Sequence, residues 1–217
     1  EDTSNATSNT ATAEITITCV NDAPVANADS MTVGEDSNSN TLDIIANDTD
    51  SDGGDTLSIS GIISTTANGT LTTSGTTQVV YTPDANFCGV DTFTYRAKDT
   101  FWPLASNTAT GTITVTCVND APVANNDIRT ATGTEDTLLT ISVLSNDTDL
   151  DNIASELSLT GLTQVSTGGV LTLSGTTEVR YTPTLNFCSA SPLTFTYQVE
   201  DASGATSNTA TGSFVVT

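Results

Sequence analysis

The sequence of 217 residues contains no histidine and only 4 lysine and arginine residues, against 26 aspartates and glutamates. Without histidine the chain cannot form a Ser-His or Cys-His nucleophile pair, and it offers zinc no imidazole ligand. The formal net charge of −22 repels phosphate, which disfavours nucleic acid and an anionic membrane surface as partners. No apolar run approaches the roughly 20 residues of a membrane-spanning helix, so we expect no membrane insertion.

The residues that are abundant form strands. Threonine is about one residue in five, and its branched side chain favours β-strands over helices. A hydrophobic share of 36% is low for one large core but sufficient for small β-domains with one wet face. A polar, acidic chain can also be disordered, but here the apolar residues alternate with polar ones, which indicates strands.

Internal repeats organise the chain. Residues 19–27 recur identically as residues 117–125, and residues 81–83 recur as residues 181–183. Self-similarity at a fixed period is the signature of a repeat architecture. We therefore expect a C-terminal strand of a preceding repeat in residues 1–20, repeat one in residues 21–118 and repeat two in residues 119–217. Both ends fall inside the repeat period, so we interpret the chain as a segment of a longer array.

Each repeat is predicted to contain about seven short strands. Phe93, Tyr95 and Ala97 alternate with polar residues, and so do Ile113 and Val115. Glycine-containing turns separate these runs, and no segment has a sustained helical period. The fold class that follows is all-β, with tandem Ig-like, cadherin-like, seven-stranded antiparallel β-sandwiches.

Several motifs occur in the same order in both repeats. In repeat one they are residues 21–26 (Asn-Asp-Ala-Pro-Val-Ala), 34–36 (Gly-Glu-Asp), 47–53, 81–83, 91–95 and Asp99. This series resembles the bacterial Ig-like, cadherin-like tandem repeat of secreted adhesins and surface fibres. The resemblance covers essentially the whole chain and implies fold more strongly than function. The cysteines depart from the usual pattern of such repeats.

The acidic loops have the ligand chemistry of a calcium site. Calcium prefers six to eight oxygen ligands, and residues 48–53 place carboxylates at alternate positions before two glycines. Residues 147–151 repeat this spacing. The alternative interpretation is that these loops are solvated acidic turns without a bound ion.

Strand directions indicate which of these groups can meet. With seven alternating strands, the N-terminal linker lies at the same end of the sandwich as the loops after strands two and six. At the junction between repeats we predict ligands from Glu35, Asp36, Asn119, Asp120, Asp147, Asp149, Asp151 and Asp201. At the preceding junction we predict Asn21, Asp22, Asp48, Asp50, Asp52 and Asp99. The resemblance to cadherins supports this placement, because cadherins bind calcium between their domains.

The four cysteines allow two pairings. Cys19–Cys88 with Cys117–Cys188 would use all four, whereas Cys88–Cys117 would lie within repeat one. The second is favoured, because Cys88 and Cys117 share one end of the predicted sandwich and Cys19 lies at the other. Cys19 and Cys188 would then have partners in further repeats. The alternative interpretation is that the cysteines are buried free thiols. Paired cysteines predict an extracellular location.

One loop of repeat one carries an apolar patch, Phe101, Trp102 and Leu104, where the equivalent loops are polar. It can pack on the neighbouring repeat, or contact another chain or a ligand.

We predict a structural, non-enzymatic role as a calcium-rigidified spacer or fibre unit of a large cell-surface adhesin or filament. The alternative is a self-assembling subunit of an extracellular filament or surface layer, and a carbohydrate-binding module is a third possibility. The expected partners are neighbouring repeats or head-to-tail copies, with lateral self-association through the apolar patch. Catalysis is not expected, because small sandwiches in series offer no deep cleft for a pair of carboxylates.

Overall fold

The computed structural model describes residues 3–4, 7–18, 20–100 and 104–217, and only the backbone of Arg129 and Thr130. It divides into two compact units, Glu1–Thr116 and Cys117–Thr217. Each unit contains one β-sandwich made of a four-stranded and a three-stranded sheet. Among the described residues, no helix has the length and apolar character needed to span a bilayer.

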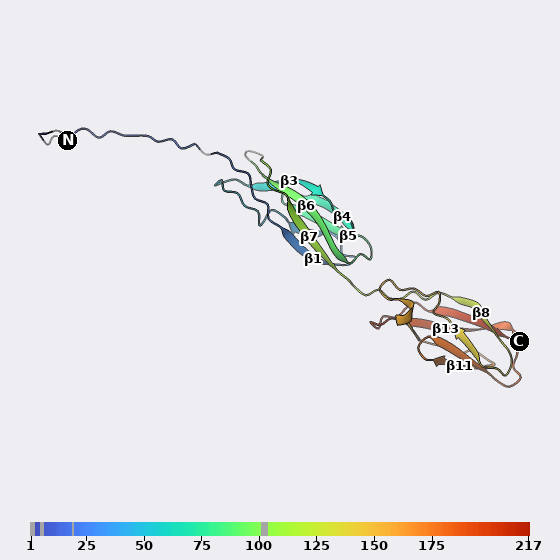
Figure 1. Ribbon diagram of the computed structural model, residues 1–217. Coiled ribbons are helices and arrows are strands. Elements are labelled where there is room, and N and C mark those ends of the chain that lie inside the picture. The colour runs from blue at the N-terminus through green and yellow to red at the C-terminus, as the bar shows by residue number, and fades with distance from the viewer. Residues whose placement is uncertain (1–2, 5–6, 19, 101–103) are drawn as a thin grey trace. The chain divides into compact units, whose positions relative to one another are not determined.

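The first sandwich contains seven strands (Figure 1). They are β1 (Asp29–Gly34), β2 (Asn40–Asp43), β3 (Leu57–Ser64), β4 (Gly69–Ser74), β5 (Gln78–Pro83), β6 (Gly89–Asp99) and β7 (Ala109–Thr116). One sheet has the order β1-β7-β6-β3 and the other the order β2-β5-β4.

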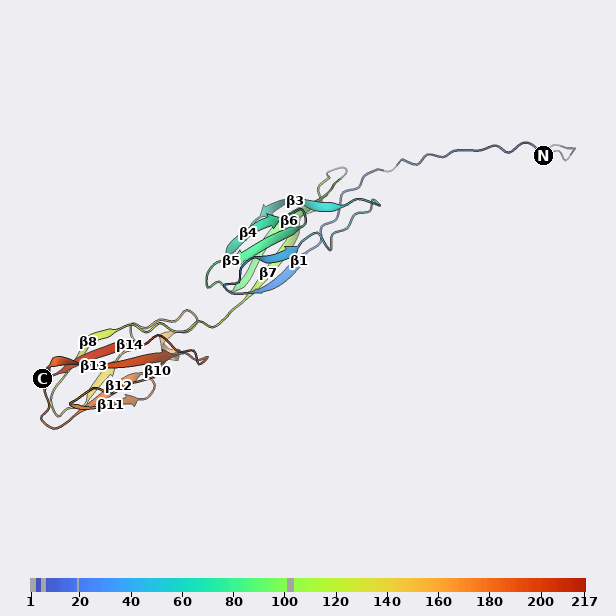
Figure 2. The ribbon, with the colours of Figure 1, turned by 180° about the vertical axis from the view of Figure 1, so that it is seen from behind.

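The second sandwich repeats this arrangement (Figure 2). Its strands are β8 (Asp127–Gly133), β9 (Leu139–Ser142), β10 (Ser158–Thr160), β11 (Gly169–Ser174), β12 (Glu178–Pro183), β13 (Ser189–Glu200) and β14 (Ala210–Val216). The sheets are β8-β14-β13-β10 and β9-β12-β11, and a short 3₁₀ turn, Ala154–Glu156, precedes β10.

The predicted all-β sandwich fold is confirmed, with one departure from purely antiparallel pairing. β1 pairs with β7 in parallel, from Asp29↔Gly111 to Gly34↔Thr116, and β8 pairs with β14 in the same sense. In a chain whose strands alternate in direction, the first and seventh strands run the same way. When they become neighbours in one sheet, they must therefore pair in parallel.

The cores follow the alternation in the sequence. Along β6, Phe93, Tyr95 and Ala97 are fully buried, and along β7 Ile113 and Val115 are buried. Because successive side chains of a strand point to opposite faces, the threonines between them lie on the outer face. The second sandwich has its own separate core of the same kind.

A glycine of β7 leaves room for an aromatic ring of β6. A Cβ atom built on Gly111 would lie 2.2 Å from Cζ of Phe93, which is fully buried. We expect Gly111→Ala to destabilise the first sandwich by roughly 1–3 kcal/mol, because the ring cannot move without disturbing the core. Urea unfolding measures the effect. Gly61→Ala in β3 is the matched control, since a Cβ there meets nothing within 4 Å, and equal stability of the two variants would contradict the prediction.

Cys88 and Cys117 form a disulfide, as predicted. Cys88 precedes β6 and Cys117 directly follows β7, so the bond closes the end of a strand pair. Cys188 is a free, exposed thiol. Cys19 lies outside the described residues, and its predicted partner remains a prediction.

Candidate metal centre

Acidic and amide side chains from three segments meet at one end of the first sandwich. The backbone N–H of Asp22 donates to Oδ2 of Asp52 at 2.6 Å, and the Ser51 hydroxyl donates to Oδ2 of Asp22 at 3.1 Å. The side-chain amide of Asn21 donates to Oδ2 of Asp99 at 3.1 Å. The segment before β1, the β2–β3 loop and the end of β6 therefore bring their predicted residues together.

The β2–β3 loop supplies the densest group of carboxylates. One carboxylate oxygen from each of Asp50, Asp52 and Asp55 lies within 4.8 Å of the other two. Unit charges this close repel by about 1 to 4 kcal/mol per pair. Partial burial, and then the charges of Asp99, Asp50 and Asp52, raise the pKa of the Asp55 carboxyl. A bound cation would replace this repulsion with attraction.

Asp55 was not among the ligands predicted from the sequence. Asp55 follows Gly53-Gly54, and Gly54 has a φ of 102°, which turns the chain so that Asp55 returns to Asp50 and Asp52. Such a positive φ is readily adopted by glycine. The glycine pair was the signal in the sequence that the loop folds back on itself.

The second repeat reproduces these contacts. The side-chain amide of Asn119 donates to Oδ2 of Asp201 at 2.7 Å, and the backbone N–H of Asp120 donates to Oδ2 of Asp151 at 2.6 Å. The N–H of Asp151 donates to Oδ1 of Asp149 at 2.8 Å. The same arrangement arises twice from two different loop sequences, so it is a property of the repeat.

Hydrogen bonds keep one of these carboxylates ionised. The Asn119 amide has the largest effect and lowers the pKa of Asp201, against the opposing effect of burial. The backbone N–H groups of Ala205, Ser203 and Gly204 also lower it. A carboxylate held in its charged form is a ready ligand for a hard cation.

Each loop also contains a buried carboxylate oxygen without a partner. Oδ2 of Asp50 and Oδ2 of Asp149 are both buried, and neither has a hydrogen-bond partner among the described residues. Buried polar atoms are nearly always paired, so an unpaired one calls for an explanation such as an ion. Among the described residues, the acidic side chains that converge here offer carboxylate oxygens, and this donor set fits Ca²⁺.

Asp48 and Asp147 were predicted as ligands, but their contacts lead into the sandwich. Oδ1 of Asp48 accepts from the N–H of Asn27 at 2.8 Å and from the Tyr95 hydroxyl at 3.1 Å. Oδ1 of Asp147 accepts from the N–H of Asn125 at 2.7 Å. The bonds from Asn27 and Asn125 tie the loop to the chain that precedes the first strand of each sandwich. Oδ2 of Asp147 is buried without a hydrogen-bond partner among the described residues, as is Oδ2 of Asp149. The role of Asp48 and Asp147 as calcium ligands stays a prediction.

Beside Asp48 lies a second carboxyl, Asp29. Burial is the main cause that raises its pKa to about 6; the charges of Asp48 and Asp43 add to it, while hydrogen bonds from Tyr95 and Asn47 oppose it. The folded state thus binds this proton more tightly than the unfolded chain, whose carboxyl has a pKa near 3.8. The stability that Asp29 contributes is present at low pH and is lost as the pH rises through about 6.

We expect Asp29→Asn to remove this part of the pH dependence and to raise the urea midpoint at neutral pH. The amide mimics the protonated carboxyl and avoids the burial of a charge. The measurement is urea unfolding between pH 4 and 8 with a chelator present, and Asp84→Asn, at an exposed carboxyl, is the control. A midpoint below that of the unmodified protein at neutral pH would contradict the assignment.

Glu35 and Asp36 lie in the turn that follows β1. The N–H of Glu35 donates to the carbonyl of Thr116 at 3.0 Å, and Oδ1 of Asp36 accepts from the N–H of Asn86 at 3.0 Å. Asp136 makes the same bond to Asn186 in the second repeat. Asp36 therefore joins two loops of its own sandwich, and the role of both residues as calcium ligands remains a prediction.

Two family models match the chain, one for each repeat. Residues 21–116 match the bacterial Ig domain, and residues 119–217 match the bacterial cadherin-like domain. The chain is a tandem of bacterial Ig-like, cadherin-like repeats. No curated protein sequence matches it.

Solved structures of cadherin ectodomains are similar to the tandem in fold. Human protocadherin-24 EC1-2 is 19% identical with a TM-score of 0.57, and the match covers 91% of this chain and 99% of that one. The protocadherin GammaB4 extracellular domain is also 19% identical with a TM-score of 0.57, over 88% of this chain. The tandem spans only 32% of that longer structure. At this identity the likeness shows the fold alone.

The family sets the broad role of the tandem. Bacterial Ig-like and cadherin-like domains are typically extracellular, non-enzymatic structural or adhesion repeats, and cadherin-like domains generally bind calcium. The acidic loops of both repeats have the oxygen ligands that such binding requires.

Two other surfaces of the tandem, the predicted apolar patch and a hollow in the second repeat, are not acidic. Of the predicted apolar patch, Phe101 and Trp102 lie outside the described residues, and Leu104 is 44% exposed.

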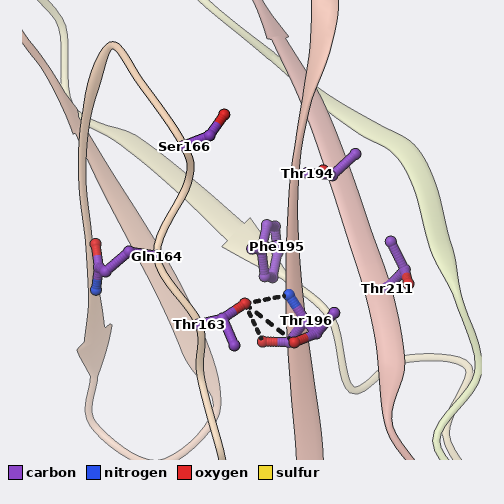
Figure 3. Close-up of a pocket in the computed structure, with 7 residues that line it drawn as sticks. All are labelled: Thr163, Gln164, Ser166, Thr194, Phe195, Thr196 and Thr211. Carbon is purple, nitrogen blue, oxygen red and sulfur yellow. Dashed lines mark hydrogen bonds between the residues drawn. The ribbon is translucent and has the colours of Figure 1, made fainter.

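A hollow of about 430 Å³ in the second repeat is lined by Phe195, Gln164 and five hydroxyl side chains (Figure 3). In it the Thr163 hydroxyl accepts from the backbone N–H of Thr196 at 2.7 Å. No acid or base is among these lining residues, so the hollow offers no proton-transfer group.

Proposed function

We propose that the chain is a calcium-rigidified spacer or fibre unit of a large cell-surface adhesin or filament. The observation that supports this most strongly is the doubled acidic centre. In each repeat an Asn-Asp pair before the first strand, the loop after the second strand and the end of the sixth strand share hydrogen bonds. A cation bound by all three segments would hold the chain entering a repeat against the sandwich that follows.

The proposed ligands come from the residues whose contacts converge. In repeat one they are Asn21, Asp22, Asp50, Asp52, Asp55 and Asp99, and in repeat two Asn119, Asp120, Asp149, Asp151 and Asp201. Glu35 and Asp36 are proposed as further ligands on the sequence prediction alone. Calcium at these groups would restrict the linker and stiffen the array.

Calorimetric titration with CaCl₂ tests the proposal at each repeat separately. We expect Asp50→Asn with Asp52→Asn to remove the binding at repeat one, and Asp149→Asn with Asp151→Asn to remove that at repeat two. The reason is that each pair supplies the unpaired oxygen and its neighbour. The control is Asp84→Asn, an exposed carboxyl in another loop. Unchanged binding in both double variants would exclude these loops as the site.

The second candidate function is a self-assembling subunit of an extracellular filament. One observation favours it: Leu104, in the predicted apolar patch, is 44% exposed, and a lateral contact between copies would bury it. A spacer would remain monomeric with calcium, whereas a filament subunit would polymerise. Light scattering in the presence of CaCl₂ separates the two.

A further inference from the structure

The segment of residues 7–18 has the sequence of a closing strand, by which we mean the last strand of a sandwich (β7 or β14), but it belongs to no sheet. Residues 8–12 are identical to residues 106–110 and 207–211, which lead into β7 and β14. The described residues 7–18 are all exposed, and none is part of a strand.

The apolar positions of the segment match those of the two closing strands. Ile15 and Ile17 align with Ile113 and Val115 of β7, which are 0% and 2% exposed. Because alternate residues of a strand share a face, Ile15 and Ile17 would enter a core together. Leaving two such side chains in water is unfavourable, and burial in a sandwich would remove this cost.

The segment also carries the polar residue that anchors a closing strand. The side chain of Asn107 accepts from the N–H of Ala26 at 2.9 Å and donates to its carbonyl at 2.9 Å. Asn208 makes the same pair of bonds to Ala124. Asn9 stands at the equivalent place, so the segment can make the same two bonds to the start of a sandwich.

The segment differs from both closing strands at two inward-facing positions, and at one of them, Ala13, the two closing strands have glycine. Ala13 stands where β7 has Gly111 and β14 has Gly212. A Cβ at Gly111 would lie 2.2 Å from Cζ of Phe93, and a Cβ at Gly212 would lie 2.2 Å from Cζ of Phe195. Neither sandwich of this chain can take Ala13 at that position without moving a ring.

Those rings are confined by the core. Phe93 is fully buried with its centroid 6.3 Å from that of Tyr95. Phe195 is 2% exposed and lies 6.3 Å from Tyr197 and 6.2 Å from Phe214. A packed core accepts an added methyl group poorly, because displaced rings clash with their neighbours.

We propose that residues 7–18 are the closing strand of a further sandwich of this repeat type. In that sandwich, the side chain opposite Ala13 is smaller than phenylalanine. A second copy of this chain does not fit as the partner, because a phenylalanine lies opposite this position in both of its sandwiches, Phe93 in the first and Phe195 in the second. This inference rests on the proposed function in one respect only, namely that the chain is one unit of an array of repeats. Calcium binding has no part in it.

The test is competition of a peptide with β14 during refolding. A peptide of residues 7–20 carries Cys19, which follows Thr18 as Cys117 follows Thr116. A peptide in the place of β14 would bring its cysteine beside Cys188, a free thiol at the position equivalent to Cys88. The full chain is refolded from urea with excess peptide, a glutathione redox buffer and a chelator, and the disulfide to Cys188 is quantified by mass spectrometry.

We expect the peptide with Ala13→Gly to cross-link to Cys188 at least about tenfold more than the native peptide. With the Phe195→Leu chain, the native peptide should approach the yield of the glycine peptide. A scrambled peptide that keeps its cysteine gives the background. Equal yields of the native and glycine peptides on the unmodified chain, or no yield above background with either, would overturn the proposal even if Phe195→Leu failed to fold. The chelator keeps this result independent of the proposed calcium sites.

Discussion

Calcium at 10 mM should raise the midpoint of thermal unfolding of each repeat by roughly 6–20 °C. Extracellular calcium modules bind with Kd values of about 10⁻⁴ to 10⁻³ M, so the ligand stabilises the folded state by about 1.4–2.7 kcal/mol. In a domain of this size each kcal/mol shifts the midpoint by about 4–8 °C. The physical source is the relief of repulsion among carboxylates such as Asp50, Asp52 and Asp55, which lie within 4.8 Å of one another. Calorimetry with calcium and with chelator, without reductant, measures the shift.

Variants assign this calcium response to the two loops. Asp149→Asn with Asp151→Asn should abolish the shift of the second repeat and leave that of the first. Asp50→Asn with Asp52→Asn should do the reverse. If calcium leaves both midpoints of the unmodified chain unchanged, the loops are solvated turns. Stiffness would then have to come from the disulfide and from packing, and the filament-subunit reading would become the leading one.

Replacing the Cys88–Cys117 disulfide should be the most damaging change outside the cores. The bond closes a loop of about 30 residues, which in the chain-entropy model contributes about 3.6 kcal/mol. The double variant Cys88→Ser with Cys117→Ser should lower the midpoint of the first repeat by more than about 10 °C. Thermal unfolding by circular dichroism measures this, and Cys188→Ser, at a free exposed thiol, is the control.

Comparison with reduced protein makes the disulfide test stricter. Reduction of the unmodified chain should reproduce the loss seen in the double variant and leave the second repeat unchanged. A loss equally large in the Cys188→Ser control would mean that general perturbation, and not the cross-link, explains the effect.

Much of the fold could be predicted from the sequence, because burial of strands follows a period of two. The alternation of Ile113 and Val115 with threonine indicated the inner face of β7 correctly. The antiparallel expectation failed for β1 and β7, because alternation along a strand says nothing about which strand becomes its neighbour. That choice depends on which sheet the first strand joins.

The loops that form the candidate site could be predicted from the sequence, whereas the contacts of each carboxylate could not. The convergence of Asn21, Asp22 and Asp99 was predicted from strand directions and from the resemblance to cadherins. Asp48 belongs to the same acidic run, and its Oδ1 accepts from a tyrosine hydroxyl and from a backbone N–H. Spacing within a loop cannot distinguish a carboxylate that points outward from one that points inward, because loop backbone has no fixed period.

The parallel pairing of β1 with β7 determines how the first repeat would bear a pulling force. The two strands pair residue by residue from Asp29↔Gly111 to Gly34↔Thr116. Tension enters at the start of β1 and leaves at the end of β7, so it pulls the two strands in opposite directions along their length. All the interstrand hydrogen bonds are then loaded together in shear, and none can open before the others. A repeat built this way resists extension far better than one whose terminal strands unzip one bond at a time.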